Sequence, residues 1–286
     1  DALIYYITGL GYKSENDELF NKYWPADLQV IGKGITRFHA VYWPAMLLSA
    51  GLPLPKAEFV HGYVTIEGQK ISKSLGNVID PFDLVKRHGT DPIRYYLLRE
   101  IPSYGDGDFS EKRFNELYNA DLANGLGNLL ARVTALAEKY CDGKVPETDK
   151  DPDSHPLRAD KTIYNWKKAW QGFDEAMGHY KFNEALASTW RFIGEADKYV
   201  NDNKPWELAE KDKNEFNWVL YGLLDGLCQI AWQVYPFLPE TSKEIGRRLN
   251  MERLLAANPQ IKDSWTNIKP GTKIISGSPL FPRKTK

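Results

Sequence analysis

The chain has 286 residues, of which 42% are hydrophobic and 26% are charged, and its 37 Lys and Arg nearly balance 38 Asp and Glu to give a formal net charge of −1. This composition is that of a globular protein and excludes disorder as the default state. It also excludes a basic field over the whole protein, which argues mildly against RNA binding but leaves a basic patch on one face open.

Cysteine usage and hydropathy indicate the compartment. Cys141 and Cys228 lie far apart, without a paired Cys or His at metal-ligand spacing, so neither a zinc site nor a disulfide framework is expected. The sequence has no apolar run of about 18 residues and no signal-peptide pattern, so no membrane is expected as a partner. A reducing, cytoplasmic compartment fits best.

The sequence becomes apolar at its second residue. The sequence opens on Asp1 rather than Met and continues into the apolar run 2–7. We interpret this as a start inside a folded element, and we expect the sequence to be a piece of a longer protein.

The first 110 residues alternate β-rich runs with helical stretches. Segment 28–33 predicts a short strand, 38–49 a helix, and 58–66 a β-rich run that ends in a tight Glu-Gly turn. Strand, helix and strand at this spacing are typical of a parallel α/β unit.

The rest of the chain is mostly helical. Pro81 is placed to open a short helix that Gly89 ends, and Asp91 with Pro92 opens another. Residues 105–108 predict a turn. Apolar residues at spacings of three and four then predict helices, before a tail of turns and short strands; the predicted helices are 115–141, 159–180, 181–203 and 216–235, and the tail is 258–286.

The pentapeptide Lys70-Ile71-Ser72-Lys73-Ser74 is the most informative motif. It combines two lysines at i and i+3 with two hydroxyls, and Gly76 follows. Ammonium and hydroxyl donors in such a loop suit the phosphates of a nucleotide and the charge that develops as pyrophosphate leaves. Taken alone, the motif fits an exposed basic loop equally well.

The surroundings of this loop resemble those in the class I aminoacyl-tRNA synthetases. The loop is similar to their K-M-S-K-S signature, with Ile71 in the Met place, and it lies between His61-Gly62-Tyr63-Val64 and Asp91-Pro92-Ile93-Arg94-Tyr95-Tyr96. The resemblance implies that Lys73 contacts the transition state of adenylate formation, with Lys70 and Ser72 in support. It also implies ATP, accompanied by Mg²⁺, as a ligand of Lys33, His61, Gly62, Tyr63, Val64, Lys70, Ser72, Lys73 and Ser74.

The run 31–46 resembles the methionyl-tRNA synthetase pattern I-G-K-D-I-x-x-F-H-x-x-x-W-P-A, and Asp1-Ala2-Leu3 with Tyr6 resembles its W-x-D-A-x-x-x-Y segment. One departure is Gly34, which stands where the family has Asp and removes a charged partner from the active site. An apolar, aromatic sleeve suits a thioether. Each residue taken singly would be ordinary core, but the resemblance implies a methionine pocket lined by Ala2, Leu3, Tyr6, Ile35 and His39.

The helical half carries a polar stripe. Asn124, Asn128 and Arg132 recur every four residues, which by itself indicates a solvated helix face. The segment 199–206 resembles the N-x-x-x-P-W element of the family, whose Trp stacks on an anticodon base, although Trp206 by itself would more often be core. The resemblance implies that Asn124, Asn128, Arg132 and Trp206 recognise the anticodon.

We therefore expect an α/β fold followed by an all-α part: the second half of a Rossmann-type parallel sheet domain, then a helical bundle anticodon-binding domain. The expected domains are the C-terminal half of the catalytic domain over 1–75, a stem-contact region over 76–114, the helical domain over 115–257 and a tail over 258–286.

The resemblance implies a monomeric methionine–tRNA ligase that uses ATP to activate L-methionine and transfers it to tRNA(Met). The H-I-G-H signature and the zinc-bearing insertion of the family do not occur in this sequence. We therefore do not expect the chain alone to catalyse the reaction. Two alternatives remain open: another class I synthetase, for Ile, Val, Leu or Cys, and a tRNA-binding module derived from the helical half.

Overall fold

The computed structural model describes residues 2–71, 78–159, 164–251 and 268–284. Their contacts divide the chain into two compact units. Unit 1 comprises Asp1–Lys70 and Pro102–Asp108, and unit 2 comprises Ile71–Ile101 and Phe109–Lys286. This division does not separate the stem-contact region, the helical domain and the tail, so the domain boundaries given above stay predictions.

Unit 1 contains a pair of parallel strands, β1 (Gln29–Gly32) and β2 (Glu58–His61), with Gln29 opposite Glu58 and Gly32 opposite His61. The connection between them is helical, as the pattern of 38–49 predicts: a π-helical segment, Phe38–Tyr42, leads into α3 (Trp43–Ser49). The predicted parallel strand, helix and strand unit is therefore confirmed.

A core cluster of unit 1 is built on α3. It consists of the buried side chains of Ile7, Trp24, Trp43 and Leu47. Two short helices, α1 (Tyr5–Thr8) and α2 (Glu18–Tyr23), belong to the same unit, and Ile7 of α1 contributes to this core.

A second, three-stranded sheet has the order β4-β3-β5. Its strands are β3 (Val64–Ile66), β4 (Gln69–Lys70) and β5 (Gly107–Phe109). Glu67 and Gly68 both have positive φ, 49° and 75°, as the predicted tight hairpin turn requires. The prediction that 105–108 is only a turn is wrong at its end, because Gly107 and Asp108 continue into β5, where Gly107 N–H donates to Tyr63 O at 3.0 Å.

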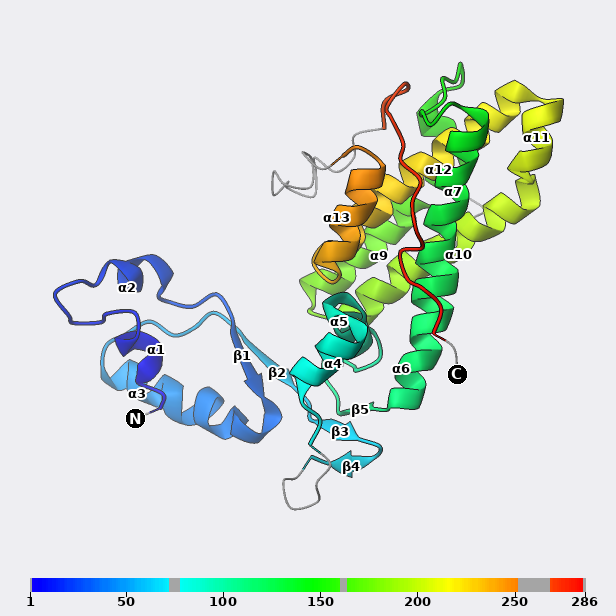
Figure 1. Ribbon diagram of the computed structural model, residues 1–286. Helices are drawn as coiled ribbons and strands as arrows, with labels where there is room; N and C mark the ends of the chain where they lie inside the picture. Colours follow the sequence, from blue (N-terminus) through cyan, green and yellow to red (C-terminus); the bar gives the residue numbers. More distant parts are fainter. Residues whose placement is uncertain (1, 72–77, 160–163, 252–267, 285–286) are drawn as a thin grey trace. The chain divides into compact units, whose positions relative to one another are not determined.

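Unit 2 is a helical bundle (Figure 1). Its helices are α4 (Pro81–His88), α5 (Thr90–Arg99), α6 (Glu111–Leu117), α7 (Asn128–Tyr140), α8 (Pro156–Ala159), α9 (Trp166–Gly178), α10 (Phe182–Asn203), α11 (Pro205–Lys211), α12 (Lys213–Val234) and α13 (Pro239–Arg248). A π-helical segment, Tyr118–Gly127, joins α6 to α7 without a break, so the predicted helix over 115–141 is confirmed.

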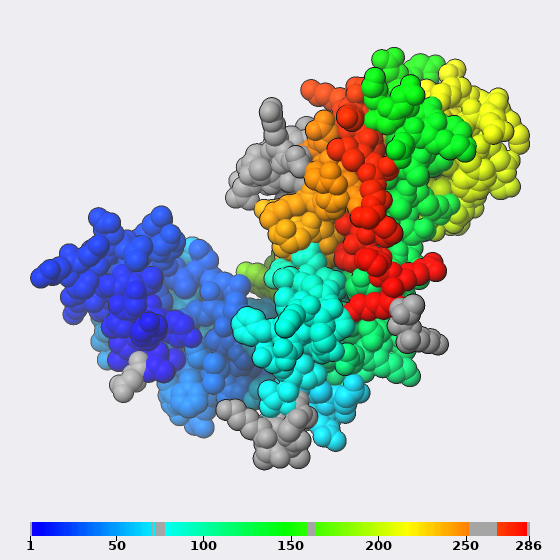
Figure 2. Space-filling view, in the orientation of Figure 1, coloured from blue at the N-terminus to red at the C-terminus, as the bar shows by residue number. Residues whose placement is uncertain are grey.

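The central helix of this bundle is α12. Asp212 caps it by accepting a hydrogen bond from Glu215 N–H at 3.0 Å, and every residue from Trp218 to Val234 is buried. A helix that is buried on all sides lies inside the bundle. The helices that pack against α12 include α7, α10 and α13. The C-terminal segment, red in Figure 2, lies in the surface between α7 and α13.

Two polar side chains of α5 fasten it to the turn between α12 and α13. Asp91 Oδ2 accepts from Thr241 N–H at 2.6 Å, and Arg94 donates to the carbonyls of Phe237 and Pro236 at 2.7 and 2.9 Å. Helix ends leave such backbone groups without partners inside the helix. The Asp-Pro-x-Arg motif therefore has a structural explanation, since it satisfies the end of one helix and the start of the next.

We expect Asp91→Ala to lower the free energy of unfolding by about 1–2 kcal/mol, because the first turn of α13 has no other side-chain cap. Urea denaturation of parent and variant would measure this. Asp149→Ala, at an exposed position outside the helices, is the control and should leave stability nearly unchanged. Equal midpoints for parent and Asp91→Ala would contradict the capping role.

Candidate functional site

Tyr6, Ile35 and His39 form one hydrogen-bonded group in unit 1. His39 Nδ1 lies 3.0 Å from Ile35 O, and His39 Nε2 lies 2.9 Å from the hydroxyl of Tyr6. A carbonyl oxygen only accepts, so Nδ1 carries the hydrogen, and in the neutral imidazole Nε2 accepts from Tyr6 O–H. The backbone of Ile35 thus fixes the tautomer of His39, which in turn orients Tyr6.

Aromatic rings surround this group. The Tyr6 ring lies 5.7 Å from that of His39 and 6.1 Å from that of Trp43, and Trp43 meets Trp24 edge-on at 5.9 Å. His39 is only 4% exposed, whereas Tyr6 and Ile35 are 40% and 44% exposed. Tyr6 and Ile35 are therefore the surface of the group, and His39 lies behind them.

Leu3 and Ala2, the other two residues predicted for methionine, do not take part in the hydrogen bonds between Tyr6, His39 and Ile35. Leu3 packs against the core that contains Trp43, and Ala2 is exposed in the turn before α1. Trp43 and Trp24 were not among the predicted site residues. Trp43 belongs to the W-P-A segment and Trp24 precedes Pro25 in the sequence. No local pattern predicts that the two rings are in contact.

A cavity of about 320 Å³ adjoins Tyr6. Gln29 lines it, and among the described residues the buried Oε1 of Gln29 has no hydrogen-bond partner. Its lining is mainly apolar and aromatic, from Tyr6, Leu10, Tyr23, Trp24, Ala26, Leu28, Gln29 and Val30.

Among the residues predicted for ATP, Lys33 and Tyr63 are in contact. Lys33 Nζ lies 4.6 Å from the centroid of the Tyr63 ring, and the β1–β2 register brings Gly32 beside His61. His61 Nδ1 lies 2.9 Å from Gly62 O, and Val64 begins β3.

Gly34, where the family has Asp, also faces Tyr63. A Cβ at position 34 would lie 2.4 Å from the Tyr63 hydroxyl. Any side chain there would require the ring of Tyr63 to move, so glycine and Tyr63 in this position are sterically matched.

Asp106 joins this group from the segment Pro102–Asp108. Its carboxylate contacts Lys33 Nζ at 2.6 Å and accepts from Tyr63 N–H at 2.8 Å. These two hydrogen bonds, the one from Lys33 first, hold the pKa of Asp106 below its usual value. Lys33 and Asp106 are 73 residues apart, so no local pattern could have paired them.

The lysine loop is mostly outside the described residues. Ser72, Lys73 and Ser74 lie outside them, and of Lys70 only the backbone, at the end of β4, is described. The roles predicted for these four residues therefore stay predictions.

The polar stripe of the helical unit lies as its spacing predicts. Asn124 and Asn128 are exposed and Arg132 is half-buried along the helix from α6 to α7. Arg132 donates to Asp197 at 2.6 Å and to Asn201 at 2.7 Å, both on α10.

Trp206 lies next to this stripe. The guanidinium carbon of Arg132 lies 6.0 Å from the centroid of the Trp206 ring. Trp206 is 41% exposed at the start of α11, so its alternative interpretation as a core residue is wrong. Asp197 was not predicted, and although Asn201 belongs to the 199–206 element, its hydrogen bond to Arg132 was not predicted either, because both links are long-range.

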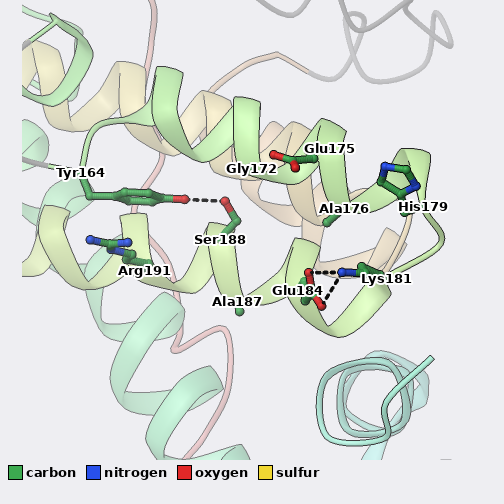
Figure 3. Close-up of a pocket in the computed structure, with 10 residues that line it drawn as sticks. All are labelled: Tyr164, Gly172, Glu175, Ala176, His179, Lys181, Glu184, Ala187, Ser188 and Arg191. Carbon is green, nitrogen blue, oxygen red and sulfur yellow. Dashed lines mark hydrogen bonds and ion pairs between the residues drawn. The ribbon is translucent and has the colours of Figure 1, made fainter. Parts of the chain in front are cut away.

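A second cavity, of about 370 Å³, lies between α9 and α10 (Figure 3). Its charged side chains are of both signs: Lys181 pairs with Glu184 at 3.1 Å, and the guanidinium of Arg191 lies 4.2 Å from the ring centroid of Tyr164. None of the residues predicted from the sequence lines it.

In the part of the chain that the structure describes, no cluster of three or more His, Cys, Asp or Glu side chains is arranged to hold a metal ion. The described helices include none with the length and hydropathy needed to span a membrane.

Comparisons with known proteins agree on one family. Residues 1–134 match the family model described as tRNA synthetases class I (M). The chain is 46% identical to the methionine–tRNA ligase of Thermotoga maritima over 98% of this chain and 44% of that protein, and 45% identical to that of Clostridium acetobutylicum over 99% and 43%. The chain thus spans less than half the length of these relatives.

A solved structure is similar as well. Mycobacterium tuberculosis methionyl-tRNA synthetase in complex with methionyl-adenylate superposes with a TM-score of 0.85 at 36% identity, over 99% of this chain and 55% of that one.

Proposed function

Because this chain belongs to the methionyl-tRNA synthetase family of class I tRNA synthetases, we propose that its protein is a methionine–tRNA ligase, which activates L-methionine with ATP and transfers it to tRNA(Met). The observation that carries this proposal is the hydrogen-bonded group of Tyr6, His39 and Ile35 among aromatic rings. It offers a thioether an apolar, polarizable wall with one oriented hydroxyl.

In this proposal Tyr6 and Ile35 contact the methionine side chain, and His39 orients Tyr6. The hydroxyl of Tyr6 donates its hydrogen to His39, which fixes the orientation of the Tyr6 ring beside the thioether. Sulfur–aromatic contacts contribute about 0.3–1.5 kcal/mol each. By the resemblance, Ala2 and Leu3 also border the methionine side chain.

ATP binds beside this wall, on Lys33, Tyr63 and the backbone of 61–64. The methionine carboxylate attacks the α-phosphorus, and negative charge grows on the departing pyrophosphate. Lys73, supported by Lys70, Ser72 and Ser74, stabilises that charge. Mg²⁺ accompanies ATP as part of the substrate.

The helical unit recognises the anticodon. An unpaired base stacks on the exposed ring of Trp206, while Asn124, Asn128 and Arg132 donate to base edges. Asp197 and Asn201 occupy two donors of Arg132 and so fix the direction of the remaining ones. We assign the protein to the cytoplasm as a monomer, with the domains 1–75, 76–114, 115–257 and 258–286.

Pyrophosphate exchange with a panel of amino acids tests the function. The full-length protein should exchange pyrophosphate in the presence of methionine and much more weakly with Ile, Val, Leu or Cys. A preference for one of those would favour another class I synthetase. Binding of tRNA without any exchange or ATP binding would favour the tRNA-binding module.

The 286-residue chain by itself is expected to lack methionine-dependent exchange. It has no H-I-G-H segment. In addition, unit 1 exposes large apolar side chains such as Val30 and Leu48, 62% and 65% exposed, as surfaces that pack against further protein do. Exchange by this chain above the rate of a no-enzyme control would contradict this.

A further inference from the structure

We propose that Asp106 and Asp108 are positioning residues of the nucleotide site: Asp106 holds Lys33 and the backbone of Tyr63, and Asp108 holds the hairpin from which the lysine loop departs. This inference rests on the proposed function, because it takes Lys33, Tyr63 and the loop to be ATP-binding. Neither carboxylate needs to touch substrate to act in this way.

Asp106 uses both carboxylate oxygens. Oδ2 binds the Lys33 ammonium at 2.6 Å, and Oδ1 accepts from the backbone N–H of Tyr63 at 2.8 Å. The same ammonium lies over the Tyr63 ring. One carboxylate therefore sets the position of the cation relative to the aromatic ring before any nucleotide arrives, which is the preorganisation that electrostatic stabilisation requires.

Asp108 acts on the β3–β4 hairpin. Its Oδ1 accepts from Thr65 Oγ1 at 2.5 Å and from Gly68 N–H at 2.7 Å. Thr65 lies directly opposite Lys70 in the antiparallel register of β3 and β4. Asp108 thus fixes the strand opposite the first lysine of the motif and the turn that precedes it.

The backbone around these carboxylates is closely packed. A Cβ at Gly62 would lie 2.0 Å from the carbonyl oxygen of Gly105, so only glycine allows this approach. Gly107 N–H also donates to Tyr63 O at 3.0 Å. The segment that carries Asp106 and Asp108 is therefore held against β3 by backbone contacts, and the two carboxylates are not needed to place it.

The exposure of the Lys33–Asp106 pair argues against a role in stability. Their side chains are 43% and 50% exposed, and exposed ion pairs contribute little to the free energy of folding. A substitution of Asp106 should therefore change ATP kinetics while leaving the fold intact.

The test is pyrophosphate exchange by the full-length protein. Asp106→Asn keeps an acceptor for Tyr63 N–H but removes the charge that holds Lys33, so kcat/KM for ATP should fall about tenfold while the KM for methionine and the Tm stay unchanged. The matched control is Asp27→Asn, which breaks another exposed Lys–Asp pair of unit 1, with Lys56 at 2.5 Å, and should have no effect.

A double variant checks the mechanism. If Asp106 acts through Lys33, Asp106→Asn added to Lys33→Met should lower kcat/KM for ATP no further than Lys33→Met alone. Asp108→Asn should lower kcat for exchange and leave the KM for methionine unchanged, because it weakens the hydrogen bonds to Thr65 and Gly68 that hold the β3–β4 hairpin.

The outcomes separate the two proposals. A parent protein without methionine-dependent exchange would refute the proposed function. This inference alone would be refuted if the parent is active and Asp106→Asn has no more effect than Asp27→Asn. It would also be refuted if Asp106→Asn lowers the Tm, raises the KM for methionine and lowers kcat/KM for ATP together.

Discussion

Lys73→Ala in the full-length protein is expected to lower methionine-dependent pyrophosphate exchange by about 10²-fold or more. Pyrophosphate carries more charge as it leaves than it does within bound ATP, and an ammonium group placed beside it stabilises the transition state more than the ground state. The binding of methionine should change little, because that part of the site is built from apolar and aromatic groups.

The measurement is the exchange rate at saturating methionine and ATP, together with the KM for each. Lys86→Ala is the control, since Lys86 is an exposed lysine of α4, outside the motif. A Lys73→Ala variant that exchanges at the parent's rate would remove Lys73 from catalysis.

Trp206→Ala is expected to raise the KM for methionine tRNA by about tenfold or more, because stacking of an unpaired base on an aromatic ring contributes about 1–3 kcal/mol. Trp206 is 41% exposed and stands beside Arg132, so its ring is accessible to a base. Exchange without tRNA should be unaffected.

Trp206→Phe is the matched variant, since a phenyl ring still stacks and should restore most of the affinity. Aminoacylation at varied tRNA concentration measures both. Equal tRNA KM for Trp206→Ala and the parent would exclude Trp206 from anticodon recognition, and a rise in KM accompanied by lost exchange would indicate damage to the fold.

Local patterns predicted much of the fold. The parallel pair β1 and β2, the helix between them and most of the long helices of unit 2 follow from hydrophobic periodicity and from Gly and Pro positions. The predicted helix over 159–180 is wrong at its start, because Tyr164 and Asn165 are not helical and Asn165 caps α9 at Trp166. The family assignment from the lysine loop and the run 31–46 is confirmed by the comparisons. Helix α13, which begins at Pro239, was not predicted, because the predicted helices stop at residue 235.

The parts that could not be predicted depend on contacts between distant residues. Asp106 meets Lys33 across 73 residues, and Arg132 meets Asp197 across 65. A single sequence holds no signal for such pairs. For the same reason the segment 105–108 was interpreted as a turn, although Gly107 and Asp108 belong to β5 and the Asp108 carboxylate accepts from Gly68 N–H in the β3–β4 turn.

Gly34, which departs from the family pattern, lies against the Tyr63 side chain. The sequence shows only that a carboxylate is missing, whereas the structure shows the Tyr63 hydroxyl within 2.4 Å of where a Cβ would stand. A side chain at position 34 would therefore require the Tyr63 ring to move aside.

The central claim is that one site combines a thioether-binding wall with a phosphate-binding lysine loop. A crystal structure of the full-length protein with a non-hydrolysable methionyl-adenylate analogue tests it most directly. The thioether should contact the side chains of Tyr6 and Ile35, with Lys73 within hydrogen-bonding reach of the phosphate position. An analogue bound away from Tyr6 and Ile35, or with Lys73 far from its phosphate end, would contradict the account.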